Sequence, residues 1–443
     1  MLLLGQLIPL SIEKPAAGGL MIARVDGQVV LVAGTIPGER VIARVTRVGK
    51  GVAYAEAASV EEPSADRRAP FTDPLCGGCG YAHIAYRRQL EIKAHVVTDA
   101  FARIGRLRLP SPVSVAASPD EGYRMRARLH IRDGRAGFFR EGTHEVCDAR
   151  QTRQLLPATS DVLDRLADGL RSLGIGAVRE LEVSENVDAS ERAIHLTTAM
   201  PVDPASLASL GHADGLTGLT IDARSPAIGQ PARVAQDASP AHVDVIAGTP
   251  HVTDVLSIDG HAVMLRRHVL AFFQANRFLL RDLVTHVVGR IAQGSLVVDL
   301  YAGVGVFAVA AAIARGARVI AVEGDRLAAR DLDANAAAAP GVDVGAVETV
   351  HMAVEAFTAR AHPRPRTVIV DPPRTGMSKE ALEGAIRLGA SQILYVSCDV
   401  ATLARDCRRI ADAGYQLSRL DAFDLFPNTP HVEAVAEFEN LRI

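Results

Sequence analysis

From residue 271 to the C-terminus, short β-branched runs alternate with segments rich in alanine and leucine. Short apolar runs are typical of buried strands, whereas longer segments with apolar residues every three or four positions are typical of helices. We predict strands near 296–300, 318–322, 367–370, 392–396, 416–422 and 432–438, and helices near 307–315, 326–338, 379–388 and 401–413. This alternation predicts an α/β fold with a doubly wound, mainly parallel sheet. The short connection between the last two strands predicts an antiparallel hairpin at the sheet edge.

Reactive side chains stand where three of these strands end or begin. Cys398 and Asp371 each follow a predicted strand, and Glu433 lies at the start of the last one. Ligands of open α/β sheets bind in the crevice outside the carboxyl ends of the strands. We therefore predict that these residues border one site. The competing interpretations are a small buried thiol for Cys398 and a surface strand position for Glu433.

A tight turn with two glycines, Gly303 and Gly305, follows the first of these strands. Such glycines let the backbone approach a ligand, and Glu323, which ends the next strand, can accept hydrogen bonds from ribose hydroxyls. Asp299, four residues before Gly303, suits a zwitterionic methionine moiety. Ala308 stands where a pyrophosphate motif expects a third glycine, although that motif tolerates alanine. The turn therefore favours S-adenosylmethionine, with a nicotinamide-dependent oxidoreductase as the alternative.

Residues 1–60 predict a small all-β module. Short apolar runs lie near 19–25, 29–33, 41–47 and 52–60. The first two are joined by Asp26-Gly27, a dipeptide typical of hairpin turns. So few strands favour an OB-like barrel, a fold that often binds nucleic acid, and a purely structural cap is the alternative.

The region 61–270 begins with a polar linker that leads to Cys76-Gly77-Gly78-Cys79. A single C-x-x-C pair is half of a metal site, a redox pair or a glycine-rich turn, and only Cys147 is a plausible further ligand. A helix is predicted from Tyr86, and its polar face, which includes Lys93, is expected to be solvated. Its apolar positions are Leu90, Ala94, Val97, Phe101 and Ile104.

The rest of this region predicts a central α+β unit that forms one wall of a substrate cleft. We expect a helix at 160–173, strands at 180–183 and 193–196, and polar, proline-rich loops near 201–240.

Composition narrows the class of protein. The 443 residues are 48% hydrophobic and 22% charged, which is ordinary for a globular protein of two or three domains. Five cysteines are too few for a secreted disulfide scaffold, the start lacks a signal peptide's basic region, and no apolar run is long enough to span a bilayer. We expect a cytoplasmic monomer with no membrane or protein partner. The net charge of −3 argues against a strongly basic nucleic-acid binder, yet nearly all cations are arginine, the bidentate phosphate ligand.

Five motifs occur in a fixed order: Asp299-Leu-Tyr-Ala-Gly-Val-Gly-Val-Phe307, Asp371-Pro-Pro-Arg374, Tyr395-Val-Ser-Cys398, Thr402-Leu-Ala-Arg-Asp406 and His431-Val-Glu433. Together they resemble the uracil-C5 RNA methyltransferases. The resemblance covers almost the whole chain, because residues 1–60 resemble that family's TRAM domain, notably at Ile36-Pro-Gly-Glu-Arg40. Cys76-Gly-Gly-Cys79 with Gln89-Leu90 and Lys93 resembles its cysteine segment. The implied organisation is a TRAM-like barrel (1–60), a linker, degenerate cysteine segment and central region (61–270), and a class I methyltransferase domain (271–443).

The resemblance implies methyl transfer from S-adenosylmethionine to C5 of a uridine in structured rRNA or tRNA, which gives 5-methyluridine. C5 of uracil is a poor nucleophile, so a thiolate must first add to C6, and Cys398 is the candidate. Glu433 then fits the base that removes the C5 proton. The implied cofactor-binding residues are Gln274, Tyr301, Gly303, Gly305, Glu323 and Asp371. A polar residue before a helix is the other interpretation of Gln274, and a catalytically idle RNA-binding protein is the other interpretation of the whole chain.

The chain departs from the family pattern at several positions. Many members hold an iron-sulfur cluster through four cysteines, but Pro70 or Phe71 and Thr152 occupy two of those places here. We therefore predict that no cluster or other metal is bound. Near the nucleophile and the glycine turn, the departures are Asp399, Val400 and Val306.

Overall fold

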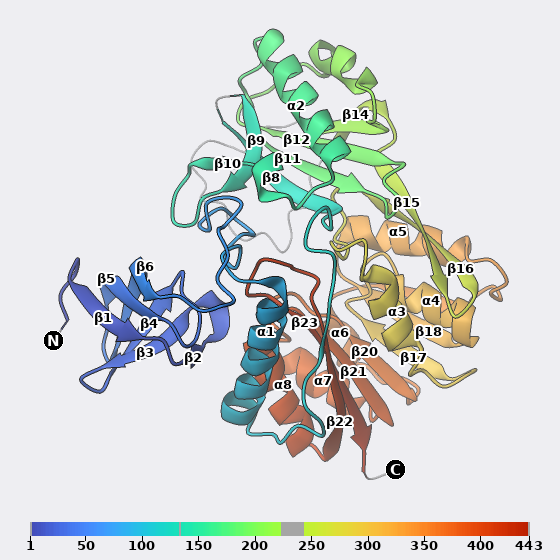
Figure 1. Cartoon of the computed structure of the whole chain (residues 1–443). Coiled ribbons are helices and arrows are strands. Elements are labelled where there is room, and N and C mark those ends of the chain that lie inside the picture. The colour runs from blue at the N-terminus through green and yellow to red at the C-terminus, as the bar shows by residue number, and fades with distance from the viewer. Residues whose placement is uncertain (1, 133, 223–242, 442–443) are drawn as a thin grey trace.

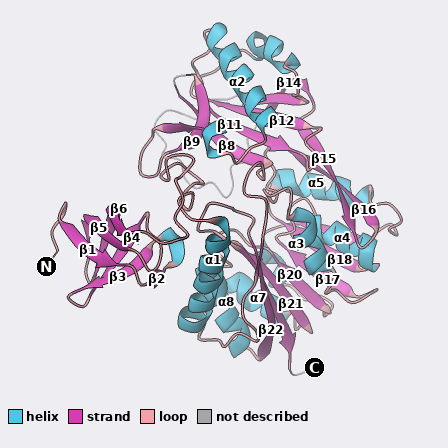
Figure 2. Ribbon diagram, in the orientation of Figure 1, coloured by secondary structure: helices cyan, strands magenta, loops and turns pink. Residues whose placement is uncertain are grey.

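The computed structural model describes residues 2–132, 134–222 and 243–441. Figure 1 shows an N-terminal β-domain to one side, a central domain at the top and the C-terminal α/β domain below. Helices cover both faces of the C-terminal sheet (Figure 2), as a doubly wound fold requires. No helix within the described ranges is long and apolar enough to cross a membrane.

The N-terminal domain is a six-stranded sheet in the order β1-β5-β6-β4-β3-β2. Its strands are β1 (Leu7–Ser11), β2 (Lys14–Pro15), β3 (Met21–Val25), β4 (Gln28–Ala33), β5 (Arg40–Val48) and β6 (Val52–Glu62). Asp26 and Gly27 have φ angles of 50° and 79°, so the predicted hairpin turn between β3 and β4 is present. The small β-domain is confirmed, but the sequence pattern missed β1 and β2. Both are short edge strands that contain a proline, which weakens the strand signal.

The C-terminal sheet has eight strands in the order β19-β18-β17-β20-β21-β23-β22-β7. They are β17 (Leu296–Leu300), β18 (Arg318–Glu323), β19 (Val347–His351), β20 (Thr367–Val370), β21 (Gln392–Ser397), β22 (Tyr415–Phe423), β23 (Glu433–Asn440) and β7 (Val115–Ala116). Strands β17 to β21 are mutually parallel, and β23 is antiparallel to both of its neighbours. The mainly parallel α/β fold is therefore confirmed.

The predicted terminal hairpin of β22 and β23 is present, but it is not at the edge as expected. The two-residue strand β7 pairs in parallel with β22 and covers it. At the other edge, β19 was also missed. Its residues are only partly buried, so it lacks the continuous apolar run of an inner strand.

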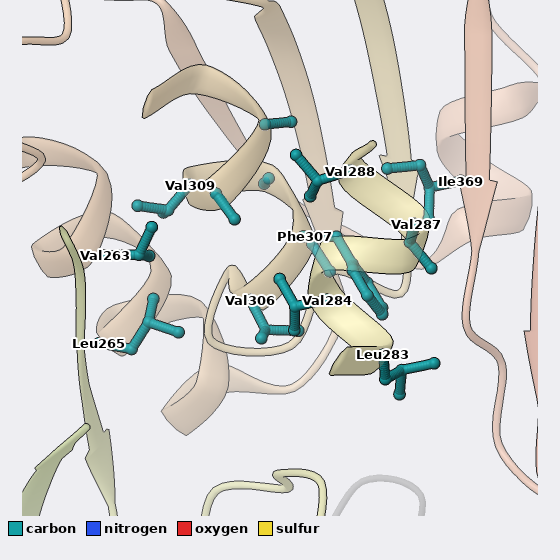
Figure 3. Close-up of a cluster of buried hydrophobic side chains, with 14 of the residues drawn as sticks. Val263, Leu265, Leu283, Val284, Val287, Val288, Val306, Phe307, Val309 and Ile369 are labelled. Carbon is teal, nitrogen blue, oxygen red and sulfur yellow. The ribbon is translucent and has the colours of Figure 1, made fainter. Parts of the chain in front are cut away.

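Helices pack both faces of this sheet. They are α3 (Leu280–Val288), α4 (Val306–Arg315), α5 (Arg326–Ala337), α6 (Val354–Thr358), α7 (Lys379–Arg387) and α8 (Val400–Asp412). Figure 3 shows one of the two cores, in which Leu283 and Val287 of α3 lie beside Phe307 of α4 and Ile369 of β20. The N-cap position of α3 is Leu279, so Asn276 does not cap this helix; its Oδ1 instead accepts hydrogen bonds from the amides of Phe278 and Leu279 in the turn that precedes α3.

Helix α1 (Tyr86–Ala100) packs on α8, beside the sheet, and also on the N-terminal β-domain, where Ile92 joins the core and Asp99 pairs with Lys14. The expectation that Lys93 lies on a solvated face is wrong, because its side chain is fully buried against Asp424. Ile104, predicted to be on the apolar face, is instead exposed. Asp424, the partner of Lys93, lies in a loop more than three hundred residues away, so the local pattern of apolar residues could not predict this pair.

The central domain has a seven-stranded sheet in the order β10-β9-β8-β11-β12-β13-β14. Its strands are β8 (Arg126–Arg132), β9 (Arg135–Phe139), β10 (Val146–Asp148), β11 (Val178–Glu185), β12 (Arg192–Thr198), β13 (Gly218–Asp222) and β14 (Val243–Gly248). Helix α2 (Pro157–Ser172) covers one face, and the hairpin of β15 (His251–Ile258) and β16 (His261–His268) extends to α4 and α5. The region predicted as loops near 201–240 contains β13, and residues 223–242 lie outside the described residues.

We expect Gly384→Ala in α7 to lower the free energy of unfolding by about 1–3 kcal/mol. An added Cβ would lie 2.1 Å from Oγ1 and 2.4 Å from Cβ of Thr358 in α6, so rotation of the threonine cannot relieve the clash. This outweighs the roughly 1 kcal/mol by which alanine favours a helix over glycine. Urea unfolding followed by circular dichroism measures the change.

Gly169→Ala in α2 is the matched control. There an added Cβ would meet only the tip of the Leu210 side chain, which can rotate away. Equal stability of the two variants would contradict the prediction, because it would show that α6 and α7 can move apart at little cost in free energy.

Candidate active site

Strand pairing brings Cys398 and Glu433 together. Ser397, at the end of β21, pairs with Ala434 in the antiparallel strand β23. The next residue along β21 is Cys398, and the preceding residue along β23 is Glu433, so the two lie at adjacent positions across the strands. Asp371 follows β20, the other neighbour of β21. The carboxyl ends of β20 and β21 and the start of β23 therefore hold these three predicted residues.

Cys398 lies in an environment that disfavours the negatively charged thiolate form of its side chain. Burial, together with the carboxyl groups of Glu433 and Asp371, raises the pKa of Cys398 to about 12. Arg374 opposes this shift through its positive charge and a hydrogen bond to the thiol. Its backbone follows Pro372-Pro373, whose rings restrict the chain after β20. Arg374 is therefore the group beside Cys398 that favours the thiolate.

The two carboxyl groups are shifted in the same direction. Burial, followed by the charge of Asp371, raises the pKa of Glu433 well above its ordinary value, and Arg374 acts against this shift. Burial also raises the pKa of Asp371 to about 7. A carboxylate with a raised pKa is a stronger proton acceptor than an ordinary one, which suits a general base.

Gln274 contacts one of the reactive side chains. Its Nε2 donates a 3.1 Å hydrogen bond to Oδ2 of Asp371, and its side chain is nearly buried. Gln274 does not cap α3, whose N-cap position is Leu279. Its amide instead fixes the orientation of a carboxyl group at the edge of the site.

The glycine turn after β17 forms the second half of the site. Glu323, at the end of β18, accepts hydrogen bonds from the amides of Gly303 (2.7 Å) and Asp325 (2.6 Å). A Cβ at Gly303 would meet no atom within 4 Å, so this face of the turn is open. Gly305 differs, because its φ is 95° and a Cβ would lie 2.7 Å from Leu332. Tyr301 is half-buried and has a φ of 63° at the start of the turn.

Asp299 is a further candidate that its position in the sequence already suggested. Its carboxyl group is fully buried, and neither oxygen has a hydrogen-bond partner among the described residues. Burial, then the nearby charge of Asp371, raises its pKa well above the ordinary value. The backbone amide of Ala308, in the first turn of α4, is the neighbouring group that acts against this shift, and both oxygens are enclosed by protein.

Sequence reasoning gave no role to Arg374 or His431. Arg374 ends the Asp371-Pro-Pro-Arg374 motif, and His431 opens the His431-Val-Glu433 motif, so the signal was present. Burial and the charge of Arg374 lower the pKa of His431 to about 4, which keeps this imidazole neutral. Its ring lies 6.0 Å from that of Phe426 in an edge-to-face arrangement. These side chains border the same site as Cys398 and Glu433.

The cysteine segment lies outside this site. Cys76 forms a disulfide with Cys147, the one further cysteine that the sequence made plausible, and Cys79 is buried. No cluster of three or more potential metal ligands occurs in the parts of the chain that the structure describes. The absence of an iron-sulfur cluster stays a prediction.

The fold and this arrangement of residues are those of a class I methyltransferase, and comparison with known proteins identifies the family. The family model described as tRNA (Uracil-5-)-methyltransferase matches residues 238–439, and the TRAM domain model matches residues 2–58. An uncharacterized RNA methyltransferase of Thermosynechococcus vestitus is 30% identical, with 98% of each chain covered. The chain therefore belongs to the RNA uracil-C5 methyltransferase family, as its motifs predicted.

Two other relatives extend the comparison. The 23S rRNA (uracil(1939)-C(5))-methyltransferase RlmD of Halomonas elongata is 30% identical, with 97% of this chain and 89% of the relative covered. The crystal structure of the Pyrococcus abyssi tRNA (uracil-54, C5)-methyltransferase in complex with S-adenosyl-L-homocysteine superposes with a TM-score of 0.74 at 24% identity. It covers 97% of this chain and 99% of that one, which shows the same fold.

Alkylation of Cys398 by iodoacetamide should keep accelerating well above pH 9. Only the thiolate reacts, and a pKa raised to about 12 means that the thiolate fraction grows about tenfold per pH unit over this range. Mass spectrometry of the labelled peptide between about pH 7.5 and 10.5 gives the rates. A plateau near pH 9 would contradict the raised pKa. The other free thiols, Cys79 and Cys407, are buried and serve as internal controls.

Arg374→Leu should slow that alkylation by about tenfold or more at pH 8.5, because the pKa of Cys398 rises further without the nearby cation. Arg374→Lys keeps the positive charge, so the rate of alkylation should fall less than in Arg374→Leu. Arg360→Leu, which removes an exposed arginine after α6, is the control for a general change in charge. Equal rates in Arg374→Leu and wild type would remove Arg374 from the site.

Proposed function

We propose that this protein transfers a methyl group from S-adenosylmethionine to C5 of a uridine in structured RNA, through a covalent bond between Cys398 and C6. The observation that carries the proposal is the adjacent placement of Cys398 and Glu433 on β21 and β23, beside Asp371 and the open glycine turn. A nucleophile within reach of C6 and a base within reach of C5 of one small planar ring are what addition and elimination require.

The residues around the glycine turn fit S-adenosylmethionine. Glu323, at the end of β18, suits the ribose hydroxyls of the cofactor. Gly303 leaves room for the ligand, while Gln274, Tyr301 and Asp371 border the path toward Cys398. When bound, the cofactor supplies an electrophilic methyl group on a sulfonium ion.

The chain's own residues supply the remaining chemistry. The Cys398 thiolate, favoured by Arg374, adds to C6 and makes C5 nucleophilic, so that C5 takes the methyl group. The C5 carbon then bears both the methyl group and the original hydrogen. Glu433 accepts this proton, the C–H electrons restore the C5–C6 double bond, and the bond from C6 to sulfur breaks to release the thiolate. Because Glu433 is buried, water does not solvate the carboxylate and weaken it as a base.

Both rRNA and tRNA are candidate substrates, and 23S rRNA is the first to test. Two relatives near 30% identity, from Halomonas elongata and Acidithiobacillus ferrooxidans, are named 23S rRNA (uracil(1939)-C(5))-methyltransferases. The enzyme named for tRNA has lower identity, 24%. The target base must be unpaired or flipped from its stack to reach a thiol at the end of a strand.

With S-adenosylmethionine and RNA that contains 5-fluorouracil, wild-type protein should form a covalent protein–RNA band on a denaturing gel. Fluorine at C5 cannot leave as a proton, so the adduct persists. Cys398→Ala should form none, and sequencing of the trapped RNA identifies the uridine. Absence of the band with the wild-type protein, together with retained RNA binding, would favour the alternative that the protein binds RNA without catalysing methyl transfer.

Glu433→Gln should lower turnover on ordinary RNA by at least about 100-fold, the usual loss when a general base is removed. The methylated adduct should accumulate in this variant because only the last step is blocked. Quantification of 5-methyluridine by mass spectrometry, alongside the gel, checks both outcomes. Normal turnover would show that another group removes the proton.

A further inference from the structure

The loop that leads to Glu433 is anchored by groups from outside the C-terminal sheet. It comprises residues 424–432 and connects β22 to β23, and Glu433 is the first residue after it. Asp424, at its start, is fully buried and receives a 2.5 Å hydrogen bond from the equally buried ammonium of Lys93 in α1. Lys93 also donates a 3.0 Å hydrogen bond to the carbonyl oxygen of Phe426. One cation therefore holds two points of the loop.

A second anchor lies in the middle of the loop. The Gln89 side chain and Asn428 form a reciprocal pair, in which Gln89 Nε2 donates to Asn428 Oδ1 (2.9 Å) and the Asn428 amide donates to Gln89 Oε1 (3.0 Å). Arg68 also donates to Asn428 Oδ1, at 2.7 Å, and the carbonyl oxygen of Asn428 accepts from the amide of Tyr81 at 2.8 Å. Asn428 is 2% exposed and has a φ of 62°, a conformation that asparagine tolerates better than most residues.

Physical chemistry makes the Lys93–Asp424 pair a poor choice for stability alone. Removing two charges from water is costly, and a buried ion pair is often replaced by apolar side chains without loss of stability. Such pairs are better explained by the single geometry that they impose. Here that geometry belongs to a loop whose last neighbour is the proposed base, while the Gln89–Asn428 pair fixes the centre of the same loop.

We infer that Lys93, Asp424 and the Gln89–Asn428 pair are positioning residues for Glu433, which they hold at the distance from the target base that proton removal needs. This inference rests on the proposed function. It assigns these residues no part in thiol addition or methyl transfer, because the loop does not carry Cys398, whose position is set by β21 and α8. The groups that hold the loop also come from segments next to the N-terminal domain, and the Pro430 ring packs on Gly19 of that domain.

The double variant Lys93→Met/Asp424→Leu tests the inference without leaving an unpaired buried charge. With ordinary RNA and S-adenosylmethionine, we expect turnover to fall at least tenfold while the covalent adduct accumulates, as in Glu433→Gln. With 5-fluorouracil RNA, the rate of adduct formation should stay within twofold of wild type, because that reaction does not need the base. Loss of general structural integrity would slow both reactions and accumulate nothing.

Asn428→Gly is a second, milder variant, since glycine keeps the positive φ and removes only the side-chain anchor. It should show the same separation of the two rates, with a smaller fall in turnover. His95→Ala, on the exposed face of α1, is the control and should behave as wild type.

Three outcomes would overturn the inference. Wild-type turnover in both anchor variants would show that the loop needs neither anchor. An equal fall in turnover and in fluorouracil adduct formation would show that the anchors support the whole site and not Glu433 in particular. Absence of any adduct in the wild-type protein would instead overturn the proposed function, and the positioning role with it.

Discussion

The antiparallel pairing of β23 with β21 is the constraint on which the site depends. In a wholly parallel sheet, every strand presents its carboxyl end at the ligand edge, so the residues there all follow strands. Because β23 runs the opposite way, its first residue lies at that edge, and Glu433 is buried directly across from Cys398. A one-residue change of register would turn the Glu433 side chain to the other face of the sheet. The reversed strand thus places the proposed nucleophile and the proposed base at two positions that share one ladder.

Burial sets the electrostatic character of the site. The carboxyl groups of Asp299, Asp371 and Glu433 all have raised pKa values, and those of Glu433 and Asp371 contribute to the raised pKa of Cys398. Arg374 is the cation that opposes these shifts on both Cys398 and Glu433. At neutral pH the raised pKa therefore keeps the Cys398 thiol protonated.

The sequence predicted the C-terminal fold well because its signals are local. Buried parallel strands are continuous apolar runs, and the helices between them begin at Asp325, Ser378 and Asp399, whose side chains cap the first turn. The positions of Cys398, Asp371 and Glu433 at strand ends followed from the same patterns. The predictions that were wrong or incomplete concern residues whose contacts are distant in the sequence. Lys93 looked solvated because its ion-pair partner is remote in sequence, and β7 is too short to give any pattern until β22 provides an edge for it.

The buried position of Lys93 also shows how helix α1 connects the N-terminal part of the chain with the C-terminal domain. Helix α1 follows the cysteine segment in sequence, yet it packs against α8 and supplies the cation that fixes the loop before Glu433. Gln89, on the same helix, bonds both to that loop and to the carbonyl oxygens of Tyr81 and Ile84, which lie just after Cys79. Helix α1 therefore joins the segment after Cys79 to the loop before the proposed base through buried hydrogen bonds, whereas Cys398 directly follows β21 of the C-terminal sheet.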